Sequence, residues 1–279
     1  MNCLSASLFS ILLALISGHP LHAQISDDDP VASGESVLAG VDRIGIYAGV
    51  NAGLQLIEAK VLPLPPGGSA PVNTPAGISG AFGIVYSRPM PNFFVTRLPA
   101  VTDPGDTARL YRKLTTFQVR LLYNRIYGSS EIAGEYPRAG SDENVPVLQT
   151  VRSAIDIVAA EPALLFDLAP MGERASPMIS LGVSLGHINA VGLNSELTPT
   201  GPGADTVMLK PDVTRHFTVT RTFYAALLLG GGGRINLGGA GAPVLVPQLE
   251  LMIPLTSIAT EAGWLPLGIR LGLGFHYPL

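Results

Sequence analysis

The 279-residue chain is rich in hydrophobic residues (47%) and poor in charged ones (14%), where a soluble globular protein usually has about 25% charged residues. Gly (32) and Pro (24) are plentiful, and beyond the N-terminus no apolar run approaches the roughly 18–20 residues of a transmembrane helix. These counts exclude a disordered chain, a coiled coil and a helical membrane protein. The net charge of −4, with 17 Lys and Arg, predicts no basic surface for nucleic acid.

The N-terminus is predicted to be a signal peptide, residues 1–23. Its apolar stretch LFSILLALIS is too short to span a membrane and suits a signal-peptide core. A helix-breaking Gly-His-Pro follows, and the small Ala23 before Gln24 marks the expected cleavage site. Cleavage would remove Cys3, the only cysteine, so we expect a mature chain without disulfides. Residues 24–40 are predicted to be a flexible leader.

Beyond residue 40, apolar residues alternate with small or polar ones, which is the pattern of a β-strand whose two faces meet different surroundings. In residues 265–277 every odd position is apolar, and the even positions include Arg270, His276 and three glycines. Such a segment is long enough to cross a bilayer at a tilt, which takes about 9–11 residues. The same alternation predicts seven further strands, within residues 44–55, 77–87, 117–124, 150–169, 179–186, 223–233 and 248–255.

Two of these strands contain predicted irregularities. The glycines Gly230 to Gly233 permit a sharp bend or bulge. Within 150–169, apolar residues occupy odd positions at Ile155 and Ile157 and even positions from Leu164 onward. Glu161-Pro162 lies at this change of phase, where we expect a β-bulge.

Eight strands without a convincing helix predict an all-β fold, an eight-stranded antiparallel up-and-down transmembrane β-barrel over residues 41–279. The polar faces are rich in Gly and Ser and hold few charges, unlike the outer face of a soluble barrel. A narrow lumen needs such small, hydrogen-bonding groups, whereas the apolar face would meet lipid. Closure of the barrel also pairs every backbone amide, as a sheet in lipid requires.

Bacterial barrels with periplasmic termini keep the outward loops long and the inward turns short. We expect long outward loops at Leu56–Ala76, Gly128–Thr150 and Ile188–Phe217, and short inward turns at Pro170–Ala175 and Gly238–Pro243. Two connections break this rule. Residues 88–112 are long for an inward turn and contain a predicted short strand at Phe93–Thr96, and Ser257–Trp264 is short for an outward loop.

Aromatic residues near the strand ends predict two membrane-interface belts. The periplasmic belt would consist of Tyr47, Tyr86, Phe275 and Tyr277, and the opposite belt of Tyr123, Phe223 and Trp264. Tyr47 is the exception in phase, because it lies on the Gly-rich side of its strand.

Three segments carry a resemblance to a known family. Ala154–Leu168 is followed by a short turn and by Met178–Gly186, in which Gly and Ser alternate with apolar residues, and Gly268–Tyr277 has the same texture. In these segments the chain resembles the small outer-membrane β-barrel family, the PorT-like branch of the OmpA-type barrels. The resemblance covers nearly the whole mature chain and implies a barrel in the outer membrane of a Gram-negative cell envelope.

The terminal strand also resembles the signal that the barrel-assembly machinery recognises. Polar Arg270, Gly272 and the aromatic Phe275 and Tyr277 stand at the expected spacing. The resemblance implies that the barrel-assembly machinery is a partner through this strand.

Apparent catalytic and metal-binding motifs are better explained by the strands that contain them. Gly182–Gly186 matches the G-x-S-x-G nucleophile pattern, but it lies inside an alternating strand rather than at the strand–turn–helix junction that exposes such a serine. Gly230–Gly233 lacks the Lys-Ser/Thr of a phosphate-binding loop, and the three histidines of the mature chain lie far apart. We predict no enzyme, no cofactor and no metal, with a barrel hydrolase using Ser184 as a minority alternative.

The most informative polar residues are charges on, or near, the non-lipid faces of the predicted strands. An arginine on the lipid face at the midplane would cost about 2–4 kcal/mol, and unpaired charges inside would be costly as well. We expect the charges to pair across the lumen as a packed polar plug, because eight strands leave no open channel. This predicted lumen charge cluster consists of Arg120, Glu161, Asp167, Glu250 and Arg270. Glu250 and Arg270 lie on strands joined by a short loop and are expected to be neighbours.

The sequence therefore predicts a non-enzymatic barrel in contact with outer-membrane lipid. Its role would be structural, or interactive with surface or secretion partners through the loops near 57–76, 128–150 and 188–217. The alternative from another class is a soluble periplasmic barrel that binds a lipophilic ligand, like a lipocalin. Membrane fractionation separates these two readings.

Overall fold

The structure, a computed structural model, describes residues 41–58, 72–74, 77–90, 115–168, 174–201, 204, 208–209, 221–238, 242–260 and 263–279. The predicted signal peptide, its cleavage site, the leader and the predicted strand at Phe93–Thr96 lie outside these residues.

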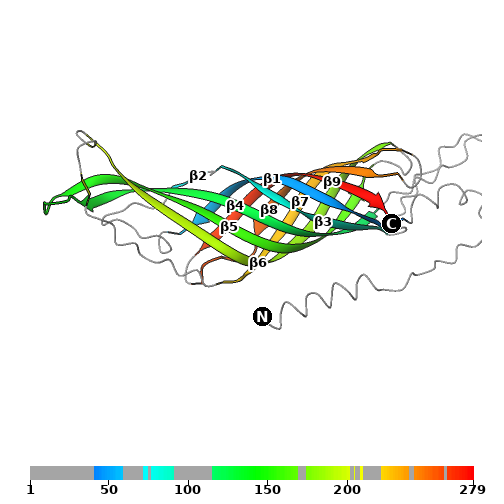
Figure 1. Cartoon of the computed structure of the whole chain (residues 1–279), viewed down its shortest axis with the longest axis horizontal. Coiled ribbons are helices and arrows are strands. Elements are labelled where there is room, and N and C mark those ends of the chain that lie inside the picture. Colours follow the sequence, from blue (N-terminus) through cyan, green and yellow to red (C-terminus); the bar gives the residue numbers. More distant parts are fainter. Residues whose placement is uncertain are drawn as a thin grey trace, which may run out of the picture. The chain divides into compact units, whose positions relative to one another are not determined.

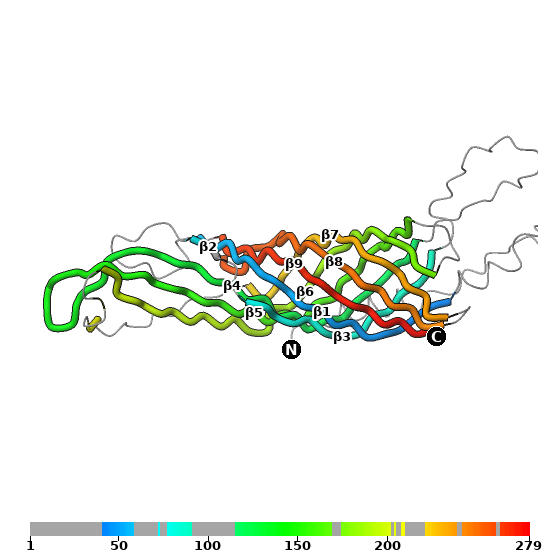
Figure 2. Tube along the Cα trace, turned by 90° about the horizontal axis from the view of Figure 1, so that it is seen from above, coloured from blue at the N-terminus to red at the C-terminus, as the bar shows by residue number. Residues whose placement is uncertain are grey.

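Eight antiparallel strands form a closed ring (Figures 1 and 2). They are β1 (Arg43–Ile57), β3 (Ile78–Met90), β4 (Thr115–Pro137), β5 (Asn144–Asp167), β6 (Ala175–Pro199), β7 (Phe223–Asn236), β8 (Val244–Pro254) and β9 (Trp264–Pro278). The ring closes where β9 pairs with β1, with Arg43 opposite Pro278 at the terminal end and Ile57 opposite Trp264 at the loop end. A short additional strand, β2 (Val72–Thr74), pairs with β4. The predicted eight-stranded up-and-down fold is confirmed. The described residues include no apolar helix of membrane-spanning length.

The two faces of the wall are inverted relative to a soluble protein. Outward-pointing Ile46 is 66% exposed and Ile78 is 74% exposed, whereas Arg120 and Arg270 point inward and are 0% exposed. The alternation predicted for each strand thus places its apolar face outside. Other exposed apolar residues of the outer wall are Phe82, Ile84, Val158, Ile179, Leu181, Leu229, Leu249, Leu251, Ile269, Leu271 and Leu273.

The bulge predicted at Glu161-Pro162 is wrong. Odd-numbered residues of β5 face inward without interruption from Val147 to Asp167. The apparent change of phase arises because Ile155 and Ile157 are apolar residues of the inward face, where they join a buried apolar cluster, whereas Leu164 and Phe166 are apolar residues of the outward face. The register shift lies instead between Asp156 and Ile157, which pair with Ala190 and Ile188 and so leave Asn189 as an extra residue on β6.

The predicted bulge at Gly230 to Gly233 is also not found. These glycines continue β7, and the β7–β8 register is the same before them and after them, with Leu229 opposite Leu251 and Ile235 opposite Leu245. At Gly232 a Cβ atom would lie 2.0 Å from the Pro247 carbonyl oxygen, so close approach of the neighbouring strand explains the glycine.

The predicted outward loop at Gly128–Thr150 is largely strand, and the one predicted at Ile188–Phe217 begins as strand. β4 and β5 continue to Pro137 and from Asn144, so that only residues 138–143 form the connection, and β6 continues to Pro199. At 23, 24 and 25 residues, β4, β5 and β6 are about twice as long as a membrane crossing requires. They project beyond the other strands at the loop end (Figures 1 and 2).

An apolar cluster fills the lumen at the loop end. Trp264 is 0% exposed within it, and Ile258, from the β8–β9 connection, folds inward beside it. Trp264 is therefore not part of an outer aromatic belt, and the short connection predicted at Ser257–Trp264 helps to close the mouth. The remaining buried members are Ile57, Ile126, Ile132, Val151, Ile155, Ile157, Ala159, Ile188, Tyr224, Ala226 and Ala259.

We predict that Trp264→Ala lowers the free energy of unfolding by about 3–5 kcal/mol, because it removes the largest buried ring of the cluster and leaves a cavity. Urea unfolding of the refolded barrel in detergent micelles measures this loss. Phe223→Ala, at an exposed outward position, is the matched control and should cost less. Equal losses for both variants would contradict the sealing role of Trp264.

Candidate functional site

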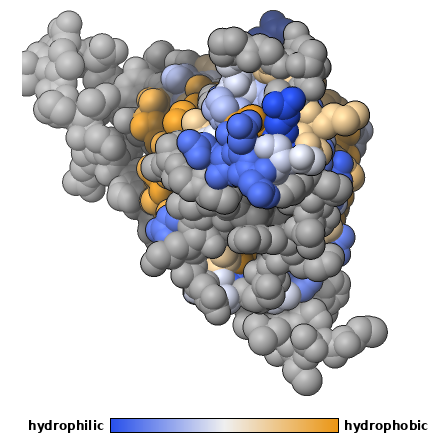
Figure 3. Space-filling model, turned by 90° about the vertical axis from the view of Figure 1, so that its left-hand side faces the viewer, coloured by the Kyte–Doolittle hydropathy of each residue, from blue (hydrophilic) through white to orange (hydrophobic). Residues whose placement is uncertain are grey.

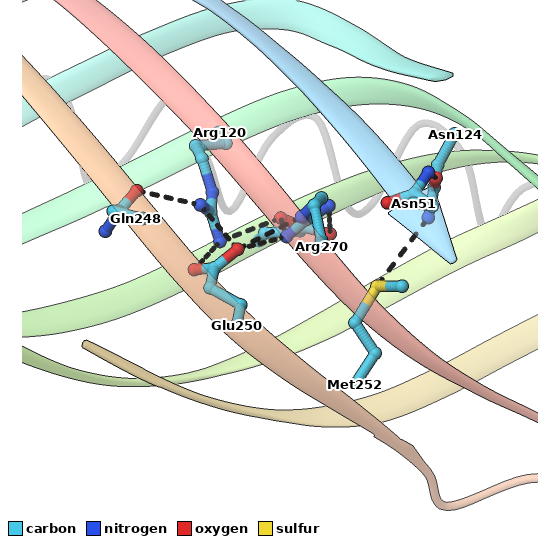
Figure 4. A network of polar contacts seen from close by, with 8 residues as sticks. Asn51, Arg120, Asn124, Gln248, Glu250, Met252 and Arg270 are labelled. Carbon is cyan, nitrogen blue, oxygen red and sulfur yellow. Dashed lines mark hydrogen bonds and ion pairs between the residues drawn. The ribbon is translucent and has the colours of Figure 1, made fainter. Parts of the chain in front are cut away.

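Four of the five predicted lumen charges meet inside the barrel, and we call them the charge quartet: Arg120 on β4, Glu161 on β5, Glu250 on β8 and Arg270 on β9. Arg120, Glu250 and Arg270 are labelled in Figure 4. Each member of the quartet is at most 1% exposed. Their inward direction follows from strand alternation, because their neighbours along each strand face outward.

Every arginine of the quartet contacts every glutamate. Arg120 lies 3.0 Å from Glu161 and 2.7 Å from Glu250. Arg270 lies 2.6 Å from Glu161 and 2.8 Å from Glu250. Two positive and two negative charges therefore balance, and the bidentate geometry is of the kind that makes such hydrogen bonds strong.

The quartet combines pairs along the wall with contacts across the lumen. Arg120 is directly opposite Glu161 in the β4–β5 ladder, and Glu250 is directly opposite Arg270 in the β8–β9 ladder. The Arg120–Glu250 and Arg270–Glu161 contacts then join these two hairpins, which the strand order separates. The arrangement ties opposite walls together and leaves no charge unpaired.

Tyr47 of β1 covers both arginines. Its ring centroid lies 4.9 Å from the Arg120 guanidinium carbon and 5.5 Å from that of Arg270, within the range of a cation–π contact. Tyr47 is 2% exposed and faces inward, so its predicted place in the periplasmic belt is wrong. Gly272 makes room for it, because a Cβ there would lie 1.8 Å from the Tyr47 hydroxyl. The off-phase position of Tyr47 in the sequence was the signal that could have found this contact.

Asp167 does not join the quartet. It lies at the end of β5 and pairs with Arg234 of β7 at 2.8 Å. Arg234 also donates to the Thr116 hydroxyl at 2.6 Å. Sequence analysis missed Arg234 because the glycines before it were interpreted as a bend rather than as a continuing inward face.

Neutral polar side chains extend the network on both sides of the quartet. Gln248 accepts a hydrogen bond from Arg120 at 3.2 Å, and Asn51 donates to Asn124 at 2.6 Å (Figure 4). Nearer the loop end, the Trp264 indole donates to Gln55 at 2.7 Å. These hydrogen bonds join polar side chains of several strands inside the barrel.

The predicted assembly residues divide between the two faces. Arg270 and Gly272 point inward and serve the quartet and Tyr47, whereas Phe275 and Tyr277 point outward and are exposed. Tyr86 lies at the same end and donates to the Asp42 carboxylate at 2.7 Å. At the other end of the outer wall, Tyr123 lies beside Phe82 with ring centroids 5.3 Å apart.

Ser184, the nucleophile of the alternative hydrolase interpretation, is 1% exposed and lies on the inward face of β6. The neighbouring His187 is exposed on the opposite face of β6, so it cannot act as a base for this hydroxyl. Among the residues that the structure describes, no group of three or more His, Cys, Asp or Glu could hold a metal ion.

Comparison with known proteins found no matching family model and no curated relative. Two crystal structures of Ail, the attachment invasion locus protein of Yersinia pestis, are similar to the chain. The structure in complex with the heparin analogue sucrose octasulfate is 10% identical, with 85% of this chain and 99% of that chain covered and a TM-score of 0.25. The other is 8% identical with the same coverage and a TM-score of 0.21. The fold of the chain is therefore established by its own strand pairings, and the OmpA-type, PorT-like resemblance stays a prediction.

We predict that Glu250→Ala lowers the free energy of unfolding by about 3–5 kcal/mol, because Arg120 and Arg270 would then share a single carboxylate in a buried site. Adding Arg270→Ala should restore part of this loss, because the Arg120–Glu161 pair at 3.0 Å remains balanced. A double-mutant cycle in urea measures the coupling. Additive losses would refute the pairing.

Proposed function

We propose that the chain is a β-barrel protein of the bacterial outer membrane, with a structural role or a role in binding partners at its projecting end. The observation that carries the proposal is the inverted wall. Large apolar side chains are exposed on the outside of seven of the eight ring strands, all except β4, and a balanced charge quartet lies inside. A soluble lipocalin-like barrel would need the reverse, with a polar outer wall and an apolar lumen open to a ligand.

Polar contacts on the outer wall mark the limits of the proposed membrane band. At the loop end, Arg125 binds Asp156 on the outer face at 2.5 and 2.7 Å, and Tyr123 lies within 3.3 Å of the same guanidinium. At the terminal end, Asp42 contacts Tyr86 and Arg88. Because charges on a lipid-facing wall are costly, the membrane would lie between these two levels.

The segments beyond Arg125 and Asp156 would then stand outside the membrane. They belong to β4, β5 and β6, and the end of the molecule that they form is polar at its tip (Figure 3). This projecting sheet, which includes much of the segment predicted as a loop at 128–150 and the first part of the one at 188–217, is the surface that partners would meet.

A non-enzymatic role is part of the proposal. The charges at the centre are all engaged with one another, and the mouth above them is filled by the apolar cluster. The G-x-S-x-G segment contains no residue that could act as a general base for Ser184 on the inward face of β6. These features favour a sealed lumen over a substrate pathway.

The purified protein should migrate differently on a gel when boiled and unboiled, because closed membrane barrels resist unfolding by detergent. In cells it should partition with the outer membrane and resist carbonate extraction. Release in the soluble periplasm, with the same mobility in both samples, would refute the membrane assignment and favour the lipocalin-like alternative.

We further propose that the barrel-assembly machinery recognises the outward rings of β9. Replacing Phe275 and Tyr277 together with Ala should leave the precursor exported but poorly inserted, as measured by outer-membrane levels. Ile269→Ala combined with Leu271→Ala is the matched control, since it removes exposed apolar side chains from the same face. Normal levels of the aromatic variant would show that these rings are incidental.

A further inference from the structure

The outer part of β6 has a partner on one side only. Its pairing with β5 continues to Pro199, opposite Val147. Its pairing with β7 ends at His187, opposite Phe223. Within the described ranges no strand pairs with the second side of Ala190–Thr198, which we call the β6 edge. At about 3.3 Å per residue this edge is roughly 30 Å long.

Two backbone hydrogen bonds show which groups of the edge are free. The amide of Thr200 donates to the Pro146 carbonyl of β5 at 2.8 Å, so even-numbered residues of this segment direct their amides and carbonyls toward β5. Before the extra residue Asn189, the amide of Ile188 instead donates to Thr222, on the β7 side. Odd-numbered residues of the β6 edge therefore direct their backbone groups away from β5: Val191, Leu193, Ser195 and Leu197.

The composition of the edge does not protect it. Edge strands usually carry Lys, Pro or inward-pointing charges that prevent pairing with another chain. Between Ala190 and Thr198 the only charged residue is Glu196, and the first proline is Pro199. Val191 and Leu193 pack against the apolar cluster, so the edge is also held in place from the inner side.

The charge of the projecting sheet indicates the chemistry of a partner strand. Glu131, Thr150 and Glu196 lie in one row across β4, β5 and β6, because Thr150 is opposite both glutamates in the two ladders. A strand added to β6 would place its next residue about 4.8 Å from Glu196 in that row. The described residues 126–155 and 188–199 carry more negative than positive charge. They contain five carboxylates and two guanidiniums: Glu131, Glu135, Asp142, Glu143 and Glu196, and Arg138 and Arg152.

We propose that the β6 edge binds an extended, basic segment of another protein by β-strand addition. Main-chain hydrogen bonds to Val191, Leu193, Ser195 and Leu197 would supply the binding energy, and basic side chains near Glu196 would supply selectivity. The proposal rests on the proposed function in one respect, because the edge must lie outside the membrane to meet a partner.

The test uses the full chain refolded in detergent micelles and amide hydrogen exchange measured by NMR. The probe is a decapeptide of alternating Val and Lys, compared with its Val–Glu counterpart and with a Val–Lys peptide N-methylated at alternate amides. We expect the Val–Lys peptide to slow exchange at least tenfold at Val191, Leu193, Ser195 and Leu197. The even-numbered amides already bond to β5 and should change little.

Two variants separate pairing from charge attraction. Leu197→Pro removes one free-edge amide and should weaken binding of the Val–Lys peptide about fivefold to tenfold, whereas the matched control Leu197→Ala keeps the amide and should bind nearly as the parent does. Glu196→Gln should reduce the preference for Val–Lys over Val–Glu.

Several outcomes would overturn the proposal. Protection of the odd-numbered amides without peptide would show that the chain itself covers the edge, and protection that rises with protein concentration would show pairing with a second copy. Equal binding of the N-methylated peptide would show charge attraction alone. Failure of the membrane assignment would appear separately, as soluble protein in fractionation with an unchanged exchange result in vitro.

Discussion

The cross-lumen contacts of the charge quartet impose the constraint on which the rest of the barrel depends. Four buried ionised side chains are stable only if each finds an opposite charge at close range. Arg120 and Glu250 reach each other from separated strands, so the lumen cannot widen without breaking their 2.7 Å contact. The backbone of the strands must therefore lie close to the side chains that fill the lumen. Glycine is needed where a Cβ atom would collide with such a side chain, as at Gly272 beside Tyr47. The Gly-rich inner face follows from the charges as much as from the small diameter of eight strands.

The lumen changes character along its axis, and this change explains how β4, β5 and β6 can extend beyond the other strands. Around the quartet the inner face is polar, whereas from Ile155 toward the loop end it is apolar and packed around Trp264. This second region resembles the core of a soluble protein, because its stability comes from side chains buried inside the wall. β4, β5 and β6 can therefore continue as a sheet beyond the proposed membrane level, supported from within rather than by lipid.

Features that depend only on the alternation of apolar and polar residues could be predicted from the sequence. Features that depend on whether an apolar face is buried in the lumen or directed outward could not. The outward faces of the strands and the Glu250–Arg270 neighbours followed from the period of two and a short connection. Ile155 and Ile157 were misinterpreted because an apolar residue at an inward core position looks the same in sequence as one that faces outward. Asn189 gave no signal, because it lies beyond the predicted strand 179–186, in the segment predicted as an outward loop. The contacts of Arg120 with Glu250 and of Arg270 with Glu161 needed the barrel radius, which no local pattern contains.

The extra residue Asn189 links the closed ring to the projecting sheet. Below it, even-numbered residues of β6 face inward and bond toward β7. Above it, odd-numbered residues face inward, so Val191 and Leu193 still reach the apolar cluster although β7 has ended. If β6 instead continued through Asn189 in regular alternation, the same residues would point outward and Asn194 and Glu196 would face the cluster, where an unpaired carboxylate is costly. The bulge therefore preserves the apolar cluster. The backbone groups of Val191 and Leu193 face the unpaired side of β6, while their side chains pack against the cluster.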